Sequence, residues 1–402
     1  MPLNIGDNRI IEDGIARITE DDAQRLERHR LAPGDIVYSR RGDVERRALV
    51  REENDGWLCG TGCLRVRLGT GHLIPEYAAY YLGHPLVRQW IVQHAVGATM
   101  PNLNTGILSA LPIVVPPLSE QESIASVLAM LDDKIDLNRR MNETLEAMAQ
   151  AIFRDWFVDF GPVRRKMEGA TDPIAIMGSL TPDPSRAAEL AELFPGTLSE
   201  DGLPQGWRTM TLAELAVHCK GSVTPLARPD IEFEHYSLPA FDTGQDPAID
   251  RGGSIKSNKT PVPDGSVLLS KLNPEISRVW LPNPATGREQ IASTEFLIFR
   301  PREGVGRGLL YFLFRDPTVR QTLSGMVTGT SKSHQRVSPP ALLQTTLLTG
   351  DGAAFMAFEG LVEPILQRGL GLRTESRILA ETRDYLLPRL MSGQVRVMEA
   401  AA

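Results

Sequence analysis

The sequence predicts an α+β protein in which two similar α/β domains are joined by two long antiparallel coiled-coil helices. Three observations indicate this fold class. No glycine or proline occurs between 118 and 160, where apolar residues recur at helical spacing. Three segments of the first half recur in the second half, each about 231 residues later. A second helical stretch follows the second copy, so the order along the chain is domain, long helix, domain, long helix.

The first domain is predicted to comprise residues 1–115. A turn signal precedes an alternating apolar strand in APGDIVYSRRGD (32–43), and a second strand-like run follows in LCGTGCLRVRL (58–68). Tyr80 and Tyr81 lie on a predicted helix at a spacing typical of a packed core. Only about thirty residues precede the first turn, whereas about sixty precede it in the second copy. We therefore expect this domain to be short at its N-terminal side.

The first long helix is predicted over residues 116–160. It begins after two prolines, with Ser119 and Glu122 at the spacing of a capping box. A helix of some forty residues makes a rod of roughly 60 Å, and its apolar stripe needs a partner helix to cover it. Asn138 interrupts the stripe, and a polar residue in such a seam commonly specifies register. Asn142 fits either the seam or its solvated flank. The residues predicted to pair the helices from this side are Ile124, Leu128, Leu131, Ile135, Asn138, Leu145 and Ile152, and the same stripe includes Met141, Met148 and Trp156.

The segment 161–205 is predicted to be an irregular connector, because it is rich in proline, glycine and acidic residues. One short helix is expected near 185–193. Arg164, Arg165 and Lys166 form a basic run that we assign to the connector surface or to a subunit contact rather than to DNA base reading.

The second domain is predicted over residues 206–348. VPDGSVLLSKLNPE (262–275) and QIASTEFLIFRP (290–301) repeat the two strand signals of the first domain. Tyr311 occupies a core-like helical position, as Tyr80 does in the first copy. The element GWRTMTLAELAVHCKGS (206–222) has no visible counterpart in the first domain.

The second long helix is predicted over residues 349–395. Pro364, Gly369 and Gly371 are expected to kink or weaken it. Two such helices from one chain can pack as an antiparallel pair, which would relate the two domains by an approximate two-fold axis. The residues predicted to pair the helices from this side are Ile365, Leu372, Leu379 and Leu386.

The composition limits the class of protein. The net charge is −7, but most of the excess acidity lies in 116–204, so a phosphate-binding face on either domain is compatible with it. Cys59, Cys63 and Cys219 provide neither a disulfide framework nor zinc-site spacing, and we expect buried thiols in a reducing cytoplasm. The absence of a signal peptide and of about eighteen consecutive apolar residues predicts a cytoplasmic protein without membrane contact.

The sequence contains no motif that predicts catalysis. An adenine-modifying methyltransferase needs an Asn/Asp-Pro-Pro-aromatic motif, whereas LNPEI (272–276) and PNPAT (282–286) each have one proline and no aromatic residue. EGVGRG (303–308) is a loose glycine cluster rather than a cofactor loop, and no GxxxxGK[ST] phosphate loop occurs. The histidines show neither metal-site nor catalytic-triad spacing. We predict no catalytic residue and no metal site in this chain.

Several segments resemble the specificity (S) subunit of type I restriction-modification systems. They are PPLSEQESIASVLAMLDDKID, FRDWFVDFGPVRRKMEG, LPQGW and ETRDYLLPRLMSGQV, and the half-motif PGDIVYSRRGD…GWLCGTGCLRVR is similar to the target-recognition domains of that family. The resemblance extends over nearly the whole chain. It implies two target-recognition domains that each read one half of a split DNA sequence, and two helices that set the distance between the halves.

The same resemblance implies the partners and cofactors. The helices would bind two methyltransferase (M) subunits, which carry S-adenosylmethionine and methylate adenine at N6. Restriction (R) subunits would use ATP and Mg. The chain itself would be a non-catalytic reader of double-stranded DNA.

Two loops in each predicted domain are candidates for DNA contact, because base reading needs side chains that reach the groove edges and phosphate contacts need cations. The first loop follows a strand and the second follows a domain helix. A solvated charged loop is the alternative explanation for both. The candidates in the first domain are Ser39, Arg40, Arg41, Arg46, Arg47, Thr99, Asn102 and Asn104. The candidates in the second domain are Lys271, Asn273, Arg278, Ser331, Lys332, His334 and Arg336.

Other functions remain open at this point. The specificity subunit of a type IIB-like system would use the same scaffold with a fused methylase-nuclease partner. A structural coiled-coil scaffold would bind DNA only weakly and without preference for a split sequence. A self-sufficient methyltransferase would have to bind S-adenosylmethionine, against which the missing motifs argue.

Overall fold

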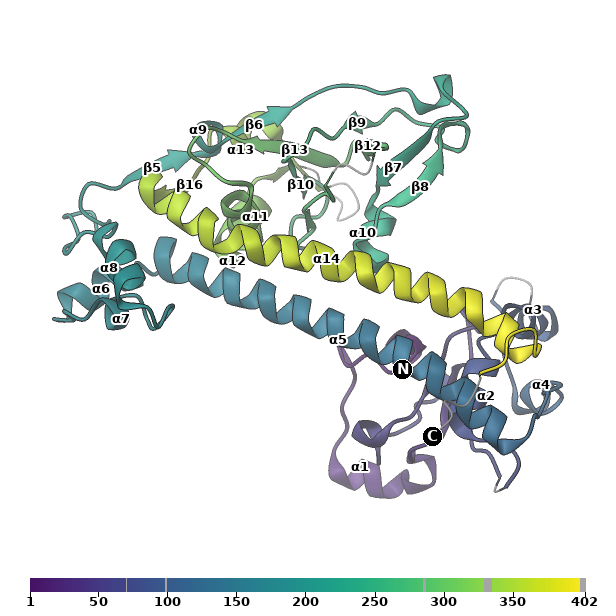
Figure 1. Cartoon of the computed structure of the whole chain (residues 1–402). Helices are drawn as coiled ribbons and strands as arrows, with labels where there is room; N and C mark the ends of the chain where they lie inside the picture. Colours follow the sequence, from purple (N-terminus) through teal and green to yellow (C-terminus); the bar gives the residue numbers. More distant parts are fainter. Residues whose placement is uncertain (70, 98–99, 285–286, 329–334, 398–402) are drawn as a thin grey trace. The chain divides into compact units, whose positions relative to one another are not determined.

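The computed structural model describes residues 1–402 except 70, 98–99, 285–286, 329–334 and 398–402 (Figure 1). The chain forms two compact units, of which unit 1 comprises Met1–Asn138 and Glu375–Ala402, and unit 2 comprises Arg139–Thr374. Helices α5 (Leu118–Phe157) and α14 (Gly352–Met391) have 40 residues each and contribute to both units. The division therefore falls within the two long helices, whereas the domain boundaries predicted from the sequence fall at their ends.

Unit 1 contains a small mixed sheet in the strand order β1-β3-β2-β4. Its strands are β1 (Asp7–Asn8), β2 (Ile36–Ser39), β3 (Arg47–Leu49) and β4 (Cys63–Val66). Its short helices are η1 (Pro2–Asn4), α1 (Glu20–Arg25), η2 (Glu27–His29), η3 (Glu52–Asn54), α2 (Pro75–Tyr81), α3 (Pro85–His94) and α4 (Thr105–Ser109). Side chains of β2, α2 and α3 form one buried apolar cluster with Leu103 and Leu111.

Unit 2 contains two four-stranded sheets, in the orders β11-β10-β13-β6 and β8-β7-β12-β9, and two two-stranded pairs, β14-β15 and β16-β5. Its strands are β5 (Arg208–Thr211), β6 (Ala216–Cys219), β7 (Glu232–Tyr236), β8 (Ala248–Arg251), β9 (Thr260–Pro261), β10 (Val267–Ser270), β11 (Val279–Trp280), β12 (Glu289–Ala292), β13 (Phe296–Pro301), β14 (Val327–Thr328), β15 (Arg336–Val337) and β16 (Thr346–Gly350). Its short helices are α6 (Gly161–Met167), α7 (Pro173–Ile176), α8 (Pro184–Glu192), α9 (Leu212–Leu215), η4 (Pro225–Ala227), α10 (Leu238–Gly244), η5 (Gly252–Ser254), α11 (Arg307–Arg315), α12 (Pro317–Gly325) and α13 (Pro339–Leu343).

The internal repeat is visible in the order of elements. Strand β2 corresponds to β10, β4 to β13, helix α2 to α11, and α3 to α12, and each set ends in a 40-residue helix. The predicted α+β fold with two repeated domains and two long helices is confirmed. One difference matters for the site: β6 covers the outer edge of β13 in unit 2, whereas β4 is the last strand of its sheet in the described part of unit 1.

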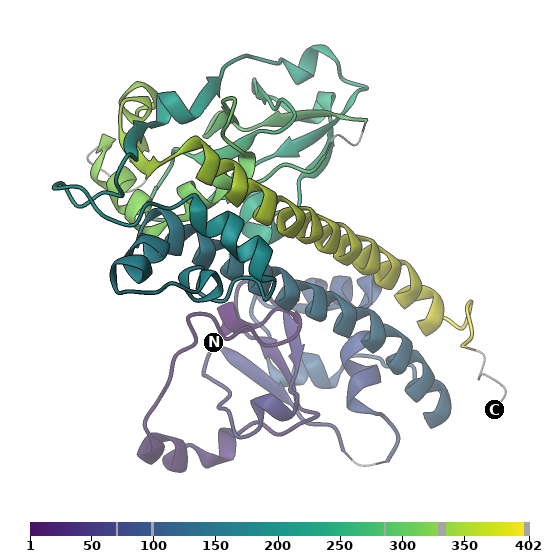
Figure 2. The same cartoon turned by 60° about the vertical axis from the view of Figure 1, so that its left-hand side comes forward.

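The long helices run antiparallel within unit 1, where they lie side by side (Figure 2). Their apolar contact is made mainly by Ile124 and Leu128 of α5 with Leu387 and Leu390 of α14. Asn138 is fully buried and donates to Glu375 Oε2 at 2.9 Å. Since the partner of an early residue of α5 is a late residue of α14, the two helices have opposite directions.

Ionic contacts flank this seam in unit 1. Arg383 of α14 donates to Asp132 of α5 at 2.7 Å and to Asp7 of β1 at 3.1 Å. Arg9 also pairs with Asp136 of α5. Partial burial alone would raise the pKa of Asp7, but the guanidinium groups of Arg47 and Arg383 outweigh it and hold this pKa below its usual value.

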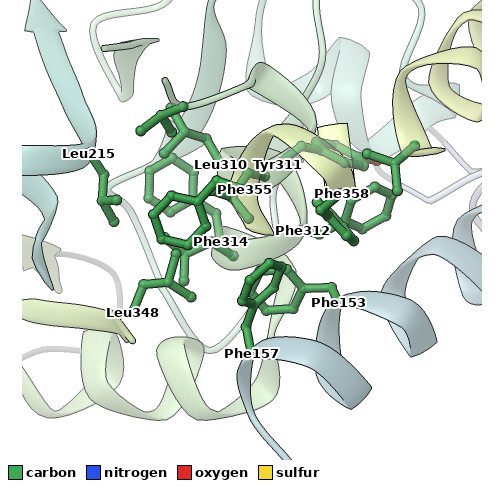
Figure 3. Close-up of a cluster of buried hydrophobic side chains, with 14 of the residues drawn as sticks. Phe153, Phe157, Leu215, Leu310, Tyr311, Phe312, Phe314, Leu348, Phe355 and Phe358 are labelled. Carbon is green, nitrogen blue, oxygen red and sulfur yellow. The ribbon is translucent and has the colours of Figure 1, made fainter. Parts of the chain in front are cut away.

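In unit 2 the long helices and the globular part share one apolar core. Figure 3 shows Phe153 and Phe157 of α5 facing Phe312 of α11 and Phe358 of α14. The ring centroids of Phe153 and Phe358 are 5.8 Å apart, and those of Phe157 and Phe358 are 5.4 Å apart, both within the favourable range for aromatic pairs. The helix segments of unit 2 are therefore part of its domain core.

The predicted apolar stripe agrees with the structure at some positions and departs from it at others. Met148 is 54% exposed, whereas the neighbouring Ala149 is fully buried, so the prediction is wrong there. The departure arises because the buried face of α5 turns toward the aromatic core of unit 2. Of the predicted pairing residues, Ile124, Leu128, Asn138 and Leu372 are buried, and Leu131, Ile135, Leu145, Ile152, Ile365, Leu379 and Leu386 are half-buried.

The second long helix, α14, runs from Gly352 to Met391 and continues through Pro364, Gly369 and Gly371. Pro364 has no amide hydrogen, so the Gly360 carbonyl lacks its usual donor within the helix. Both residues lie on the exposed face of α14, where water can donate to that carbonyl. Gly369 is required for packing, since a Cβ there would lie 2.7 Å from Asn142 Oδ1. Asn142 in turn donates to the Gly369 carbonyl at 3.2 Å.

The start of α5 also differs from the prediction. The helix begins at Leu118, so Ser119 lies inside it and is not the capping residue. Gln121 anchors this end instead: it is fully buried, its Nε2 donates to the carbonyl oxygens of Pro116 and His72 at 2.8 Å, and its Oε1 accepts from the Ile74 amide at 2.9 Å.

The connector is ordered rather than irregular. It contains helices α6, α7 and α8, and Val163, Leu190 and Phe194 are buried in the core of unit 2. The basic run stabilises this packing: Arg165 makes two hydrogen bonds to Asp155, and Lys166 donates to main-chain carbonyl oxygens at the end of α8. The prediction is wrong for α6 and α7, because it weighed the proline and glycine content above these apolar positions, whereas α8 lies where the one short helix was predicted.

The glycine cluster at 303–308 lets α11 approach α14 closely. A Cβ on Gly308 would lie 2.7 Å from Val362 Cγ2, and one on Gly306 would overlap the Glu359 carboxyl group. The Glu359 carboxylate accepts from the amides of Gly308 and Leu309 at 3.1 Å, a favourable position for a negative charge at a helix N-terminus. These glycines thus have a packing role.

Candidate nucleic-acid interface

The structure brings together the two loops of unit 1 that the sequence singled out. The Leu103 amide donates to the Arg40 carbonyl at 2.9 Å, and the Gly42 amide donates to the Pro101 carbonyl at 3.0 Å. These bonds join the turn after β2 to the segment after α3. We call this arrangement the loop pair.

Unit 2 contains the same loop pair. The Val337 amide donates to the Lys271 carbonyl at 3.0 Å, and the Asn273 amide donates to the Gln335 carbonyl at 3.1 Å. The turn after the strand is also the same. Gly42 has φ +77° and Asn273 has φ +50°, both in the left-handed region that glycine and asparagine tolerate best.

A buried serine closes the turn in each copy. The Ser39 hydroxyl donates to the Arg41 carbonyl at 3.0 Å, and the Ser270 hydroxyl donates to the Leu272 carbonyl at 3.1 Å. Ser39 is only 1% exposed, so the prediction that it contacts DNA is wrong. Its role is to hold the turn in shape.

Arg47 is also placed differently from the prediction. It lies on β3, its side chain is 6% exposed, and its Nε donates to the Ala79 carbonyl of α2 at 2.8 Å. Its Nη1 donates to Asp7 at 3.1 Å. A guanidinium held in this way cannot reach a ligand, so the prediction of a DNA contact is wrong for Arg47.

The remaining arginines of the first loop differ in their availability. Arg41 is exposed and Arg40 is half-buried, and within the described residues neither guanidinium has an ion-pair partner. Arg46 is exposed but pairs with Asp43 at 2.8 Å. Among the arginines of this loop, Arg41 is therefore the most available to an anionic ligand.

The second segment of the unit 1 loop pair supplies carboxamides. Asn102 is half-buried and forms single bridges with Arg41 and Val96. Asn104 is exposed, and its Oδ1 caps α4 by accepting from the Ile107 amide at 2.9 Å. Its Nδ2 group has no hydrogen-bond acceptor among the described residues. Thr99 lies outside the described residues.

In unit 2 the loop pair carries fewer available cations than the sequence predicted. Arg278 makes two hydrogen bonds to Asp242, at 2.7 and 2.9 Å, and its side chain is 12% exposed, so its guanidinium is neutralised within the protein. Arg336 makes two hydrogen bonds to Glu295, at 3.0 and 3.1 Å, which leaves it partly neutralised. Ser331, Lys332 and His334 lie outside the described residues.

Lys271 gains basic neighbours that sequence reasoning missed. It follows β10, and Lys220 follows β6 two strands away in the same sheet. Burial lowers the pKa of His218 on β6, and the positive charges of Lys220 and Lys271 lower this pKa further. The strand order therefore places Lys220 and Lys271 at the same end of this sheet, with the neutral form of His218 favoured beside them, which the linear sequence does not reveal.

Among the described residues, neither a metal-binding cluster nor a cysteine of lowered pKa is found. In the part of the chain that the structure describes, no three His, Cys, Asp or Glu side chains gather as a metal site would require. The three cysteines are free, and burial raises the pKa of Cys59 to about 11, which makes its thiol unreactive. No described helix is both long and apolar enough to cross a membrane.

The chain is similar to several known proteins. Residues 5–147 match the family model described as the type I restriction modification DNA specificity domain. The type I restriction enzyme HindI specificity subunit of Haemophilus influenzae is 25% identical, covering 98% of this chain and 94% of that protein. The MjaIX specificity subunit of Methanocaldococcus jannaschii is 22% identical, covering 81% of this chain and 70% of that protein.

A solved structure is similar in fold. The S subunit of the type I restriction-modification system from M. genitalium has a TM-score of 0.51 and 14% identity, covering 89% of this chain and 83% of that one. The family match shows that residues 5–147 form a type I restriction modification DNA specificity domain, and over most of its length the chain is similar to type I restriction enzyme specificity subunits.

Proposed function

We propose that this chain reads a bipartite DNA target for a type I restriction-modification complex, one half with each unit. The observation that supports this proposal is the loop pair, which occurs in both units with matching hydrogen bonds. In each copy the residue directly after the strand is a cation, Arg40 or Lys271, without an ion-pair partner among the described residues. Unpaired cations on a turn are suited to phosphate contacts.

The two kinds of side chain in the loop pair suit different parts of a duplex. Arg41 and Lys271 would contact phosphates and so position the protein without reading sequence. Asn102 and Asn104 would reach base edges, because a carboxamide can make two hydrogen bonds with adenine. In unit 2, Lys220 would add to the phosphate contacts of Lys271.

The long helices would set the gap between the two halves of the target. A helix of 40 residues is roughly 60 Å long. Half-sites one turn of DNA apart are separated by about 34–36 Å, which is within that reach. A fixed gap in the target would follow from the fixed length of the helices.

The proposed partners supply the chemistry. Two M subunits would bind S-adenosylmethionine and methylate adenine at N6, and R subunits would use ATP and Mg for restriction. The chain would direct them to its target and would itself remain non-catalytic.

The proposal is tested by selecting bound sequences from a random duplex pool with the complex of this chain and its methyltransferase. We expect two short conserved halves separated by a gap of constant length. Selection of one continuous sequence, or of none, would contradict the proposal.

A variant pair tests the loop pair directly. Arg41→Ala should weaken binding to all duplexes about equally and lower the slope of log affinity against log salt by about 1, as expected for a lost phosphate contact. Arg46→Ala is the matched control, since its guanidinium pairs with Asp43, and it should change the slope less. Equal slopes for Arg41→Ala and the parent would exclude Arg41 from the interface.

A further inference from the structure

A partly buried hydrogen-bond network connects the unit 1 domain to both long helices. The Tyr80 hydroxyl on α2 donates to Asp132 Oδ2 on α5 at 2.8 Å. Arg383 on α14 donates to the other oxygen of the same carboxylate at 2.7 Å. The Asp132 side chain is 13% exposed and that of Arg383 is 16% exposed. One carboxylate thus joins three elements in a place where water competes poorly.

Unit 2 contains a network of the same composition. The Tyr311 hydroxyl on α11 donates to Glu146 Oε1 on α5 at 3.1 Å, and Arg373 on α14 pairs with the same carboxylate. Arg315 on α11 adds a contact to Glu146 at 3.0 Å. Tyr311 is 1% exposed. Again a tyrosine of the domain, a carboxylate of α5 and an arginine of α14 meet.

The duplication of the domain does not account for both networks. Tyr80 and Tyr311 occupy corresponding positions of α2 and α11, as the repeat requires. The position of α14 that corresponds to Asp132 is Leu366, which is buried and apolar. The carboxylate in unit 2 comes instead from Glu146 on α5. The same chemistry is therefore built at non-corresponding helix positions, which indicates a requirement beyond common ancestry.

We propose that Tyr80 and Tyr311 are positioning residues that fix how each recognition domain is oriented on the helix pair, and thereby the DNA gap that the complex accepts. This inference rests on the proposed function. Apolar packing around the tyrosines is non-directional, whereas a hydrogen bond to a buried carboxylate fixes both distance and angle. Helices α2 and α11 continue into α3 and α12, which lead directly into the loop pairs. A small rotation at the tyrosine therefore displaces the loops, and about 3.4 Å corresponds to one base pair.

The test uses conservative variants in the complex of the full chain with its methyltransferase. Tyr80→Phe and Tyr311→Phe remove only the hydroxyl group. Tyr81→Phe is the matched control, because the Tyr81 hydroxyl donates to the main-chain carbonyl of Pro112, which lies outside both long helices. Methylation rates are measured on duplexes that carry the parent's own target with the natural gap and with gaps one base pair shorter or longer. Thermal unfolding shows that each variant is folded at the assay temperature.

The measured quantity is the ratio of the methylation rate on an altered gap to the rate on the natural gap. We expect this ratio to rise about tenfold in Tyr80→Phe and Tyr311→Phe, because each variant loses one hydrogen bond to a charged group. The ratio should stay unchanged in Tyr81→Phe. Asp132→Asn should raise the same ratio, because it removes the charge that holds Arg383. A purely structural role would lower all rates together and leave the ratio unchanged, which would overturn the inference. If the parent itself ignored the gap, the proposed function would fail instead.

Discussion

Replacing Arg47 by alanine is expected to destabilise unit 1 and not to act as the loss of a DNA contact. The side chain is 6% exposed and donates to the Ala79 carbonyl at 2.8 Å and to Asp7 at 3.1 Å. Ala79 is fully buried, so its carbonyl would lose its donor where water cannot replace it, at a cost of about 1–3 kcal/mol. The ion pair adds up to about 1 kcal/mol, since Asp7 is 59% exposed. We expect a loss of about 3 kcal/mol in the free energy of unfolding.

The assay is thermal unfolding together with hydrogen exchange of peptides from β3 and α2. A loss of about 3 kcal/mol lowers the melting temperature of a unit of this size by roughly 6–12 °C. Arg46→Ala is the control on the neighbouring residue, and it should cost less than about 1 kcal/mol because its pair with Asp43 is exposed. Unchanged unfolding of Arg47→Ala, combined with weaker DNA binding and a smaller salt slope, would refute this reasoning.

Two further predictions concern the helix seam and the pH dependence. Gly371→Ala should stabilise α14 by about 1 kcal/mol, because a Cβ at this position meets nothing within 4 Å. Gly369→Ala should stabilise it less or destabilise it, because its Cβ would lie 2.7 Å from Asn142 Oδ1. Chemical denaturation of both variants measures this, and equal gains would contradict the packing role of Gly369. Asp7→Asn should lower stability above pH 4 by less than about 1 kcal/mol, with the difference disappearing as the pH falls through the depressed pKa of the native carboxylate. Melting temperatures between pH 7 and pH 3 test this, and a difference independent of pH would count against an ion pair.

The architecture could be predicted because local sequence patterns determine it. The stripe that contains Ile124 and Leu128 has helical spacing, and the repeated segments are similar enough to align by eye. The same local rules predicted one of the three connector helices, α8, but not α6 and α7, where a few apolar residues outweigh the proline and glycine content.

The candidate site could be predicted only in outline. The sequence indicated which loops carry cations, but it could not show that the Ala79 carbonyl needs the Arg47 side chain or that Asp242 neutralises Arg278. Such partners lie 32 and 36 residues away along the chain. Lys220 was missed for a related reason, since only the strand order of the sheet brings it toward Lys271.

The most direct test of bipartite reading is to co-express the chain with its methyltransferase in a host and to map N6-methyladenine across the genome by single-molecule sequencing. The account predicts methylation at one split motif, with two short halves and a constant gap, that disappears when this chain is omitted. Methylation that does not depend on the chain, or that occurs at a continuous motif, would contradict it.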